Sequence, residues 1–118
     1  DVGGGTSYSM LRTLAEGYKV LQLQHQNLPA LYGFYWLTLG NARALHLDDR
    51  IGRLAPGREA DIVVLDARAT PAMAHRAKRV ESLEEELFLL MTLGDDRAVA
   101  ATYIAGERAH ASVSIGNA

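Results

Sequence analysis

The sequence predicts an α/β fold, with helices in its first 47 residues and short strands, separated by one further helix, after residue 61. Three observations lead to this prediction. Apolar residues recur at helical spacing from Met10 onward. Ile62–Leu65 is an unbroken run of mostly β-branched apolar residues, which strands favour. Ser82 and Glu85 form a capping box before an apolar segment.

The first predicted helix follows a run of three glycines. Either Thr6 or Ser7 is the expected N-cap, because a hydroxyl oxygen can accept a hydrogen bond from a free N–H of the first helical turn. Gly17 predicts a kink or an early end, because glycine is a poor helix former. The expected apolar face consists of Met10, Leu11, Leu14, Ala15, Tyr18 and Leu21.

A second helix is predicted to begin at Pro29, since proline is tolerated in the first turn. Residues 31–39 are apolar almost without interruption, so this helix needs protein on nearly all of its sides. A chain of 118 residues offers little to surround it, and the segment therefore indicates a missing partner surface. Residues 41–47 add a short helical turn, which Asp48 and Asp49 end.

The remaining elements are predicted from turn and capping signals. Pro56 and Gly57 suit the two central positions of a type II turn. The strand at Ile62–Leu65 is expected to be buried on both faces, because polar residues do not alternate along it. Residues 67–81 have weak periodicity and are interpreted as a connection. Strands are expected over residues 97–104 and 107–110, joined by a turn at residues 105–106.

The helix that starts at Ser82 is expected to run to about Leu93, with Gly94 as its stop. Its three glutamates, residues 84–86, are interpreted as a solvated helix start rather than an acid–base pair. The expected buried stripe consists of Leu83, Leu87, Leu90 and Met91.

Composition narrows the class of protein. The length of 118 residues allows one modest core but not a complete (β/α)8 barrel, which needs about 200 to 250 residues. A formal charge of −2 gives no electrostatic footprint for nucleic acid, and no apolar run approaches the roughly 20 residues of a membrane span. The absence of cysteine excludes disulfides and thiolate metal sites and fits a cytoplasmic protein. The first residue is Asp1 rather than methionine, which we interpret as a partial reading frame.

A family resemblance begins at residues 52–64, which read Gly-x-Leu-x-Pro-Gly-x-x-Ala-Asp-Ile-Val-Val. This motif resembles the segment by which metal-dependent amidohydrolases leave their barrel and enter a small β domain. Residues 38–45 resemble the helix that precedes it. The opening Asp-Val-Gly-Gly-Gly-Thr-Ser, at residues 1–7, is similar to the end of the last barrel strand in the guanine deaminase branch. Residues 94–106 also resemble this branch more than the superfamily as a whole.

The resemblance implies the C-terminal portion of such an enzyme. Residues 1–49 would supply the last strand end and helices of a TIM-type (β/α)8 barrel, and residues 50–118 part of a small β-sandwich domain with one helix. The implied reaction is zinc-dependent hydrolysis of guanine to xanthine and ammonia, with no nucleic-acid or membrane partner. The isolated 118 residues are expected to be inactive, and the apolar helices to mediate homodimer formation.

Asp1 is the residue to which the resemblance gives catalytic and metal-binding roles. In the family this aspartate helps to hold the metal ion and moves protons between the metal-bound water and the substrate. The alternative is that Asp1 is only a terminal aspartate. The loop Gly3, Gly4 and Gly5 is expected to border the substrate, or else to be a simple strand-to-helix connection, since it matches neither phosphate-binding glycine pattern.

The other chemistry-bearing residues are predicted to be structural. The four histidines are far apart and lack the spacing of metal ligands, so this chain alone is not expected to hold a catalytic zinc ion. Asp61 is expected to fix a turn through backbone hydrogen bonds. The aromatic run at residues 34–36 is expected to pack rather than to stack on nucleic-acid bases. The four histidines are His25, His46, His75 and His110.

Two other functions stay open. The chain can belong to a sibling amidohydrolase that acts on another aminated or halogenated heterocycle. It can also be a non-catalytic module that self-associates or completes a barrel in trans.

Overall fold

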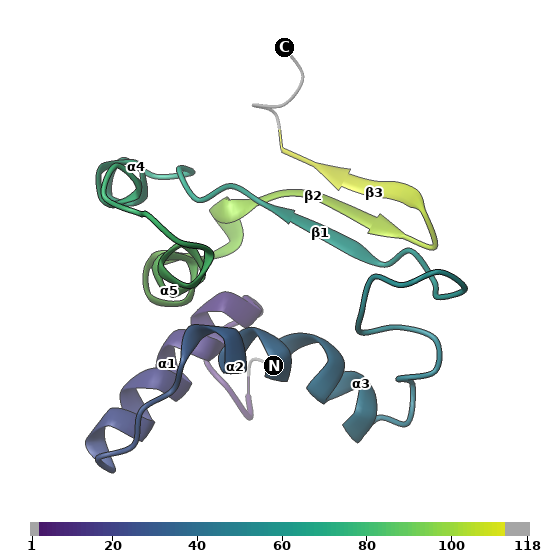
Figure 1. The fold of residues 1–118 in the computed structure, drawn as a ribbon, viewed down its shortest axis with the longest axis horizontal. Coiled ribbons are helices and arrows are strands. Elements are labelled where there is room, and N and C mark those ends of the chain that lie inside the picture. Colours follow the sequence, from purple (N-terminus) through teal and green to yellow (C-terminus); the bar gives the residue numbers. More distant parts are fainter. Residues whose placement is uncertain (1–2, 113–118) are drawn as a thin grey trace. The chain divides into compact units, whose positions relative to one another are not determined.

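The structure, a computed structural model, describes residues 3–112, and Figure 1 shows its helices and strands. It divides into two compact units. The helical unit comprises the chain up to Phe34 together with Ala67–Ala98, and the sheet unit comprises Tyr35–Asp66 together with the chain from Val99 onward. The mixed content of helices and strands agrees with the predicted α/β class.

The helical unit begins with α1 (Met10–Leu23), whose N-cap is Ser9. The Ser9 hydroxyl accepts a hydrogen bond from the Arg12 N–H at 3.4 Å. The prediction of Thr6 or Ser7 as the cap is therefore wrong: Ser9 directly precedes the first helical residue, and Ser7 instead accepts a hydrogen bond from the Ser9 N–H.

Of the two alternatives predicted at Gly17, the early end is wrong, because α1 continues to Leu23, and the kink stays a prediction. Leu11 and Leu14 are buried and fix the helix through tertiary packing, which outweighs the low propensity of one glycine. A Cβ atom at position 17 would meet nothing within 4 Å, so the glycine lies where the surface is open.

Helix α5 (Leu83–Leu93) confirms the predicted capping box and stop. The Ser82 hydroxyl accepts a hydrogen bond from the Glu85 N–H at 3.2 Å, while the Glu85 carboxylate accepts one from the Glu81 N–H at 2.8 Å. Gly94 is the C-cap, and its N–H donates to the Leu90 carbonyl at 2.9 Å.

The predicted buried stripe of α5 is correct for Leu90 and Met91 but wrong for Leu83, which is 65% exposed. Leu83 lies in the first turn, beyond the part of the helix that packs on the core. Leu89 was missed by the sequence pattern and is 2% exposed. The core of the helical unit is completed by the buried side chains of Leu11, Leu14, Leu28 and Met73.

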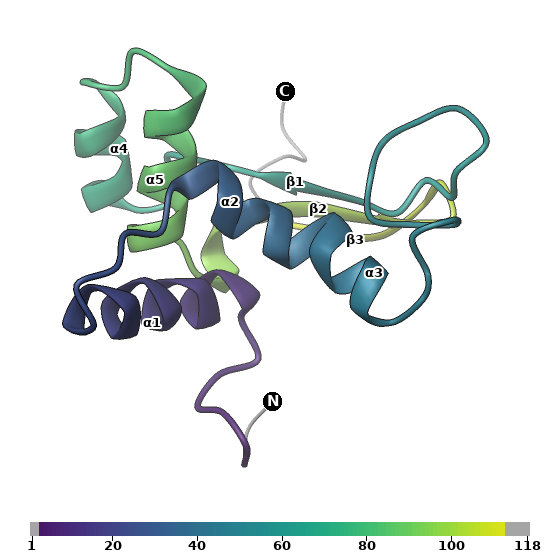
Figure 2. The same ribbon diagram turned by 60° about the horizontal axis from the view of Figure 1, so that its bottom comes forward.

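Helix α4 (Pro71–Ala77) occupies part of the segment that was expected to be an irregular connection, so that expectation is wrong. Thr70 caps it by accepting a hydrogen bond from the Met73 N–H at 3.3 Å, and Met73 is fully buried. The signal in the sequence was Thr70 followed by Pro71, an N-cap residue and a proline in the first helical turn. Figure 2 shows α4 and α5 side by side in the helical unit.

The apolar segment that follows Pro29 is helical, as predicted. Helix α2 (Ala30–Tyr35) is followed without a loop by a π-helical turn, η1 (Trp36–Gly40), and by α3 (Asn41–Ala44). The chain does not cover this segment fully, since Leu31 is 52% exposed, Tyr32 54% and Trp36 40%.

The sheet unit contains an antiparallel sheet of three strands in the order β1 (Ile62–Leu65), β2 (Val99–Ile104) and β3 (Glu107–Ala111). A 3-10 turn, η2 (Asp96–Ala98), precedes β2. In the register of the sheet, Val64 lies opposite Ala101, which in turn lies opposite Ala111. The strands and the turn at residues 105–106 confirm the sequence prediction.

The predicted burial of β1 on both faces is wrong within the described residues. Val63 is 57% exposed and Val64 is 42% exposed. These two residues are consecutive, so their side chains point to opposite faces of the sheet, and the described residues cover neither face of β1 fully.

The loop that precedes β1 is stabilised by local hydrogen bonds. Gly57 has a φ of 81°, which the predicted turn requires. The Arg58 N–H closes this turn by donating to the Ala55 carbonyl at 3.1 Å. Arg50 Nε donates to Glu59 Oε1 at 2.7 Å and ties the two sides of the loop together. Among the described residues, no helix is long and apolar enough to cross a membrane.

Candidate functional site

The N-terminal loop carries the candidate site, and only part of it is described. Asp1 lies outside the described residues, so its predicted role is not tested by the structure. Gly3–Gly5 form an exposed bend. Gly3 has a φ of 138°, which residues with a side chain rarely adopt, and its N–H donates to the Gly5 carbonyl at 3.0 Å.

The segment between this bend and α1 is fixed by two serine side chains. Ser7 Oγ accepts a hydrogen bond from the Ser9 N–H at 2.9 Å. Ser9 then caps α1 through Arg12, and its carbonyl accepts from both the N–H and the hydroxyl of Thr13. The loop is thus connected to the helix by hydrogen bonds rather than by the chain alone.

The four histidines, interpreted as surface or structural residues, are all exposed. His25 and His46 follow the ends of α1 and α3 and adopt φ values of 57° and 58°. His75 lies on α4, and His110 lies on β3. Within residues 3–112, no group of three or more histidine, cysteine, aspartate or glutamate side chains could hold a metal ion. The described residues therefore do not by themselves fit the metal centre that the resemblance implies.

Asp61 is structural, as predicted, although the turn it fixes is not the one next to it in sequence. Its Oδ1 accepts a hydrogen bond from the Ala105 N–H at 2.8 Å. The Gly106 N–H donates to the Ala60 carbonyl at 3.0 Å. These two bonds fasten the β2–β3 turn to the residues that precede β1.

The aromatic run does not form an open stacking platform. Phe34 and Tyr35 are half-buried, in agreement with the predicted packing role, and only Trp36 of the three is exposed. The Tyr35 hydroxyl accepts a hydrogen bond from Arg43 Nη1 at 3.1 Å.

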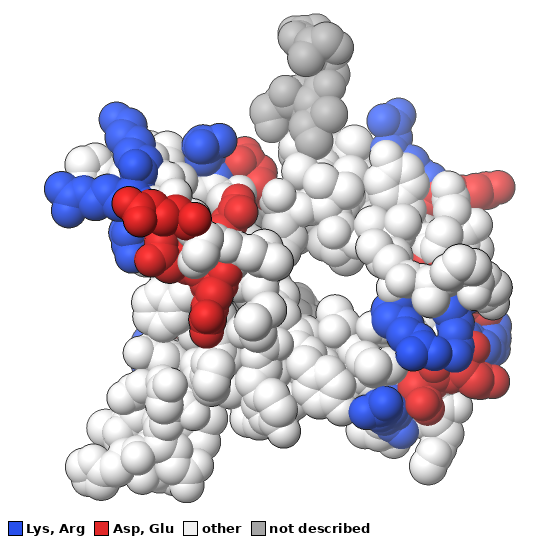
Figure 3. Space-filling model, viewed as in Figure 1, with Lys and Arg blue, Asp and Glu red and all other residues white. Residues whose placement is uncertain are grey.

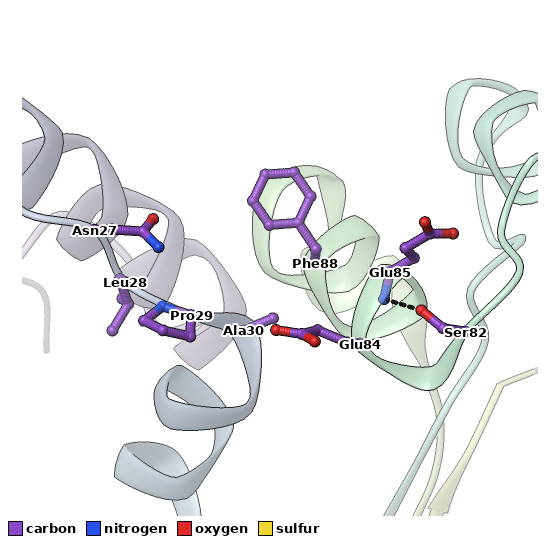
Figure 4. A pocket seen from close by; sticks show the side chains of 8 residues that line it. All are labelled: Asn27, Leu28, Pro29, Ala30, Ser82, Glu84, Glu85 and Phe88. Carbon is purple, nitrogen blue, oxygen red and sulfur yellow. Dashed lines mark hydrogen bonds between the residues drawn. The ribbon is translucent and has the colours of Figure 1, made fainter.

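A surface pocket of about 420 Å³ in the helical unit was not predicted. Figure 4 shows residues 27–30 on one side of it and the first turns of α5 on the other. No local pattern of residues indicates this pocket, because its two sides are more than 50 residues apart. The lining side chains belong to Asn27, Leu28, Pro29, Ala30, Ser82, Glu84, Glu85 and Phe88.

The acidic side chains at this pocket match the predicted solvated helix start. Glu84, Glu85 and Glu86 are exposed, and they lie at the end of α5 where the helix dipole favours negative charge. His75 and Arg76 lie in the last turn of α4, where the helix dipole favours positive charge. Figure 3 shows acidic and basic side chains next to each other in this region. Both sets of charges are therefore explained by the helix ends on which they lie.

The clearest electrostatic effect lies in the loop after α5. Arg97 donates to both carboxylate oxygens of Asp95, with Nη2 2.7 Å from Oδ2 and Nε 3.0 Å from Oδ1. These hydrogen bonds lower the pKa of Asp95 below its ordinary value. The pair fixes the entry to η2, because the Arg97 N–H also donates to Asp95 Oδ1 at 3.0 Å.

Comparison with known proteins identifies the family of this chain. Residues 1–109 match the model of the amidohydrolase family. Guanine deaminase of Escherichia coli (strain K12) is 52% identical over 106 residues, which cover 90% of this chain and 24% of that protein. Imidazolonepropionase of Micrococcus luteus is 39% identical over 72 residues, covering 61% of this chain and 17% of that protein.

A solved structure of E. coli guanine deaminase is similar with a TM-score of 0.91 and 49% identity, covering 95% of this chain and 26% of that one. The chain thus spans about a quarter of the length of the guanine deaminase that it matches. Because the family model matches nearly its whole length, the chain belongs to the amidohydrolase family.

Proposed function

We propose that the chain is the C-terminal segment of a guanine deaminase, an enzyme that hydrolyses guanine to xanthine and ammonia. The observation that carries this proposal is the 52% identity to E. coli guanine deaminase over 90% of the chain. The high structural similarity to the same enzyme supports it. The activity belongs to the complete native polypeptide, and the isolated 118 residues are proposed to be inactive.

Asp1 is proposed as the catalytic carboxylate of this segment and as one ligand of a zinc ion. A zinc-binding site needs further ligands, which residues 3–112 do not provide as a group. The proposal therefore places those ligands outside the described residues. Metal analysis of the native polypeptide tests this, with zinc as the expected metal and loss of activity on chelation as the expected result.

Gly3, Gly4 and Gly5 are proposed to border the substrate. All three are exposed and have no side chain, so the backbone of this loop can approach a flat purine closely.

The domain assignment is also a proposal. Residues 1–49 would complete a TIM-type barrel, and residues 50–118 would form part of a small β-sandwich domain with one helix. The exposed valines of β1 support the second part, because an apolar edge strand needs further protein to cover it.

The guanine deaminase is proposed to act as a cytoplasmic homodimer that uses its apolar helices, with no nucleic-acid or membrane partner. Leu31 and Tyr32 on α2 are the supporting observation, since both are more than half exposed. Replacing both residues with glutamine should shift the native polypeptide from dimer to monomer in light scattering. The control is Leu54→Gln, which changes a leucine that lies in a loop and is 74% exposed, and it should leave the dimer intact.

A second candidate is an amidohydrolase that acts on another heterocycle, and the similarity to imidazolonepropionase favours it. A panel of guanine, adenine, cytosine and a chlorinated triazine, tested on the native polypeptide, separates the two. Guanine should have the highest kcat/KM. Turnover of another compound without turnover of guanine would overturn the first proposal.

A third candidate is a non-catalytic module that self-associates or completes a barrel in trans, and the exposed apolar residues of α2 favour it. It predicts that the native polypeptide, purified alone, has no hydrolytic activity on any member of the panel. Activity on guanine by the purified polypeptide excludes it.

A further inference from the structure

We propose that the pocket between residues 27–30 and the start of α5 binds an arginine side chain of a second copy of this chain, and that Arg79 is this arginine. The inference rests on the homodimer of the proposed function and deepens it, because it names a contact between the two copies. It concerns the helical unit alone, which contains both the pocket and Arg79.

The walls of the pocket combine an aromatic ring, a carboxylate and apolar side chains. Phe88 is 37% exposed, and its ring lies edge-to-face with that of Tyr18, with the ring centroids 5.6 Å apart. Leu28 and Ala30, each 2% exposed, line the opposite side. A guanidinium group suits such walls, because it is flat, stacks on aromatic rings and binds a carboxylate through two hydrogen bonds.

Glu84 provides the carboxylate that is available to this ligand. In Figure 4 its side chain extends from α5 towards Ala30, whereas the Glu85 side chain points away from Ala30. The Glu85 carboxylate already accepts a hydrogen bond from the Glu81 N–H at 2.8 Å. Within residues 3–112, the Glu84 carboxylate forms no ion pair. Glu84 can therefore neutralise a cation that enters the pocket.

The complementary charge lies on the neighbouring helix and the turn that follows it. Arg76, Lys78 and Arg79 lie at and just beyond the end of α4, and all three are exposed. None of them forms an ion pair with another described residue. In Figure 3 the basic side chains over α4 lie beside the acidic side chains over α5. The helix dipoles explain where these charges lie but do not pair them with each other.

A second copy of the chain can pair both signs of charge at once. In a dimer with two-fold symmetry, a contact from one residue to another is repeated with the two copies exchanged. An acidic pocket and a basic turn on one helical unit are thus satisfied twice in each dimer. Arg79 is the best placed of the three cations, because it lies on the turn that leads to Ser82 and carries a guanidinium rather than the compact ammonium of Lys78.

Apolar side chains continue this surface beside the pocket. Leu31 and Leu83 directly follow Ala30 and Ser82, two residues that line the pocket, and are 52% and 65% exposed. Apolar contacts around a charged pair exclude water from it, and the pair is stronger in the lower dielectric that results. Leu31 also belongs to the surface proposed above for the homodimer, so the pocket is continuous with that surface.

The test exchanges the charges of the two residues in the native polypeptide. Sedimentation equilibrium gives the dissociation constant of the dimer for wild type, Glu84→Lys, Arg79→Glu, the double variant and an equimolar mixture of the two single variants. The matched controls are Glu86→Lys and Arg53→Glu. Both residues are exposed, Glu86 lies on α5 but does not line the pocket, and Arg53 lies in the sheet unit. The melting temperature shows that each variant is folded.

Each single variant should weaken the dimer about 10- to 100-fold, because it brings like charges together in both symmetric contacts. The double variant should recover most of the wild-type affinity. The mixture should recover it too, because both contacts of the mixed dimer join opposite charges. Recovery in the mixture identifies a contact between copies, since an ion pair inside one chain would be restored in the double variant only. The controls should change the dissociation constant less than about threefold.

Three results overturn the proposal: single variants that dimerise like wild type, a mixture that dimerises as weakly as its components, and a monomeric wild type. A Glu84→Lys variant that dimerises like wild type but melts at a lower temperature assigns the pocket to another part of the same polypeptide. Guanine turnover is measured on the same wild-type preparation. A dimeric wild type that leaves guanine unchanged contradicts the proposed reaction, whereas the dissociation constants decide the contact in either case.

Discussion

Asp61 and Ala105 are 44 residues apart in sequence, yet Oδ1 of Asp61 accepts a hydrogen bond from the backbone N–H of Ala105 at 2.8 Å. Ala105 has a φ of 50°, so the turn that it forms with Gly106 is one that an alanine adopts at a cost. The carboxylate holds that turn in place. The aspartate of the family motif is therefore a long-range clamp between the approach to β1 and the β2–β3 turn.

Asp61→Ala should destabilise the native polypeptide by about 0.5 to 1.5 kcal/mol, because the Ala105 N–H loses its charged acceptor. Asp61→Asn is the matched control, since the amide oxygen can still accept this bond. Hydrogen exchange at Ala105 gives the local readout and should quicken in the alanine variant only. Equal protection in both variants would show that the clamp has no energetic role.

Gly52→Ala should be strongly destabilising, by roughly 2 kcal/mol or more, because it combines two penalties. Gly52 has a φ of 92°, and a Cβ atom there would lie 2.7 Å from Ala42 Cβ and 3.0 Å from Leu39 Cα. Gly57→Ala is the control, since Gly57 also has a positive φ but a Cβ atom would meet nothing within 4 Å.

Chemical denaturation of the native polypeptide and of both variants separates the two penalties. Gly57→Ala should cost about 1 kcal/mol, which is the conformational part alone. Equal losses in the two variants would contradict the close approach at Gly52.

His25→Gly and His46→Gly should each raise stability by about 0.5 to 1 kcal/mol. Both histidines occupy the left-handed position after a helix, where glycine has no Cβ penalty. The ends are alike: the Gln26 N–H reaches the Leu21 carbonyl at 2.9 Å, and the Leu47 N–H reaches the Ala42 carbonyl at 2.8 Å.

The control for these substitutions is His75→Gly within α4, which should lower stability by about 1 kcal/mol. Thermal unfolding gives the comparison. If His25→Gly and His46→Gly both melt below wild type, the imidazole side chains make contacts whose stabilisation outweighs the conformational cost of a positive φ.

Arg97→Ala should raise the pKa of Asp95 towards its ordinary value, because Arg97 provides the hydrogen bonds that lower it. A depressed pKa in the folded state stabilises the protein above the unfolded pKa, and this contribution is lost as the pH falls through the folded pKa. Wild type should therefore lose more stability than Arg97→Ala on acidification through the range in which carboxyl groups titrate.

Carboxyl-carbon NMR titration of Asp95 measures the pKa directly, with Arg108→Ala on β3 as the control. An unchanged pKa for Asp95 in Arg97→Ala would contradict the proposed cause.

The elements that the sequence predicted well are those fixed by local chemistry. The Ser82–Glu85 capping box and the Pro56–Gly57 turn each depend on a few adjacent residues, and both occur as expected. The cap of α1 was misplaced because several hydroxyl residues precede Met10 and local chemistry does not choose among them. Tertiary contacts to Leu11 and Leu14 set where the helix begins.

The remaining errors concern burial. Ile62–Leu65 has the composition of a strand covered by protein on both faces, but the described residues leave Val63 and Val64, which point to opposite faces, partly exposed. The same applies to the apolar α2, whose Leu31 and Tyr32 side chains are more than half exposed among the described residues. The apolar pattern of a segment indicates how much protein should cover it. The structure of a chain that spans about a quarter of its relative shows only the part of that cover which the chain itself provides.

The candidate site was predictable only in part. The Asp1 motif pointed to the chemistry through its resemblance to a family, and the family model confirms that family but not the role of Asp1. The pocket near Phe88 was unpredictable, because it joins residues 27–30 to a helix more than 50 residues later. The serine hydrogen bonds of the N-terminal loop likewise depend on backbone geometry that residue types do not reveal.

The most direct test of the central claim is the conversion of guanine by the purified native polypeptide, compared with its Asp1→Asn variant. Chromatography would follow guanine and xanthine, and a coupled assay would follow ammonia. The account predicts equal amounts of xanthine and ammonia from wild type and at least a 100-fold lower rate from Asp1→Asn, in line with the contribution of a general acid–base group. A wild-type protein that leaves guanine unchanged, or an Asp1→Asn variant as active as wild type, would contradict it.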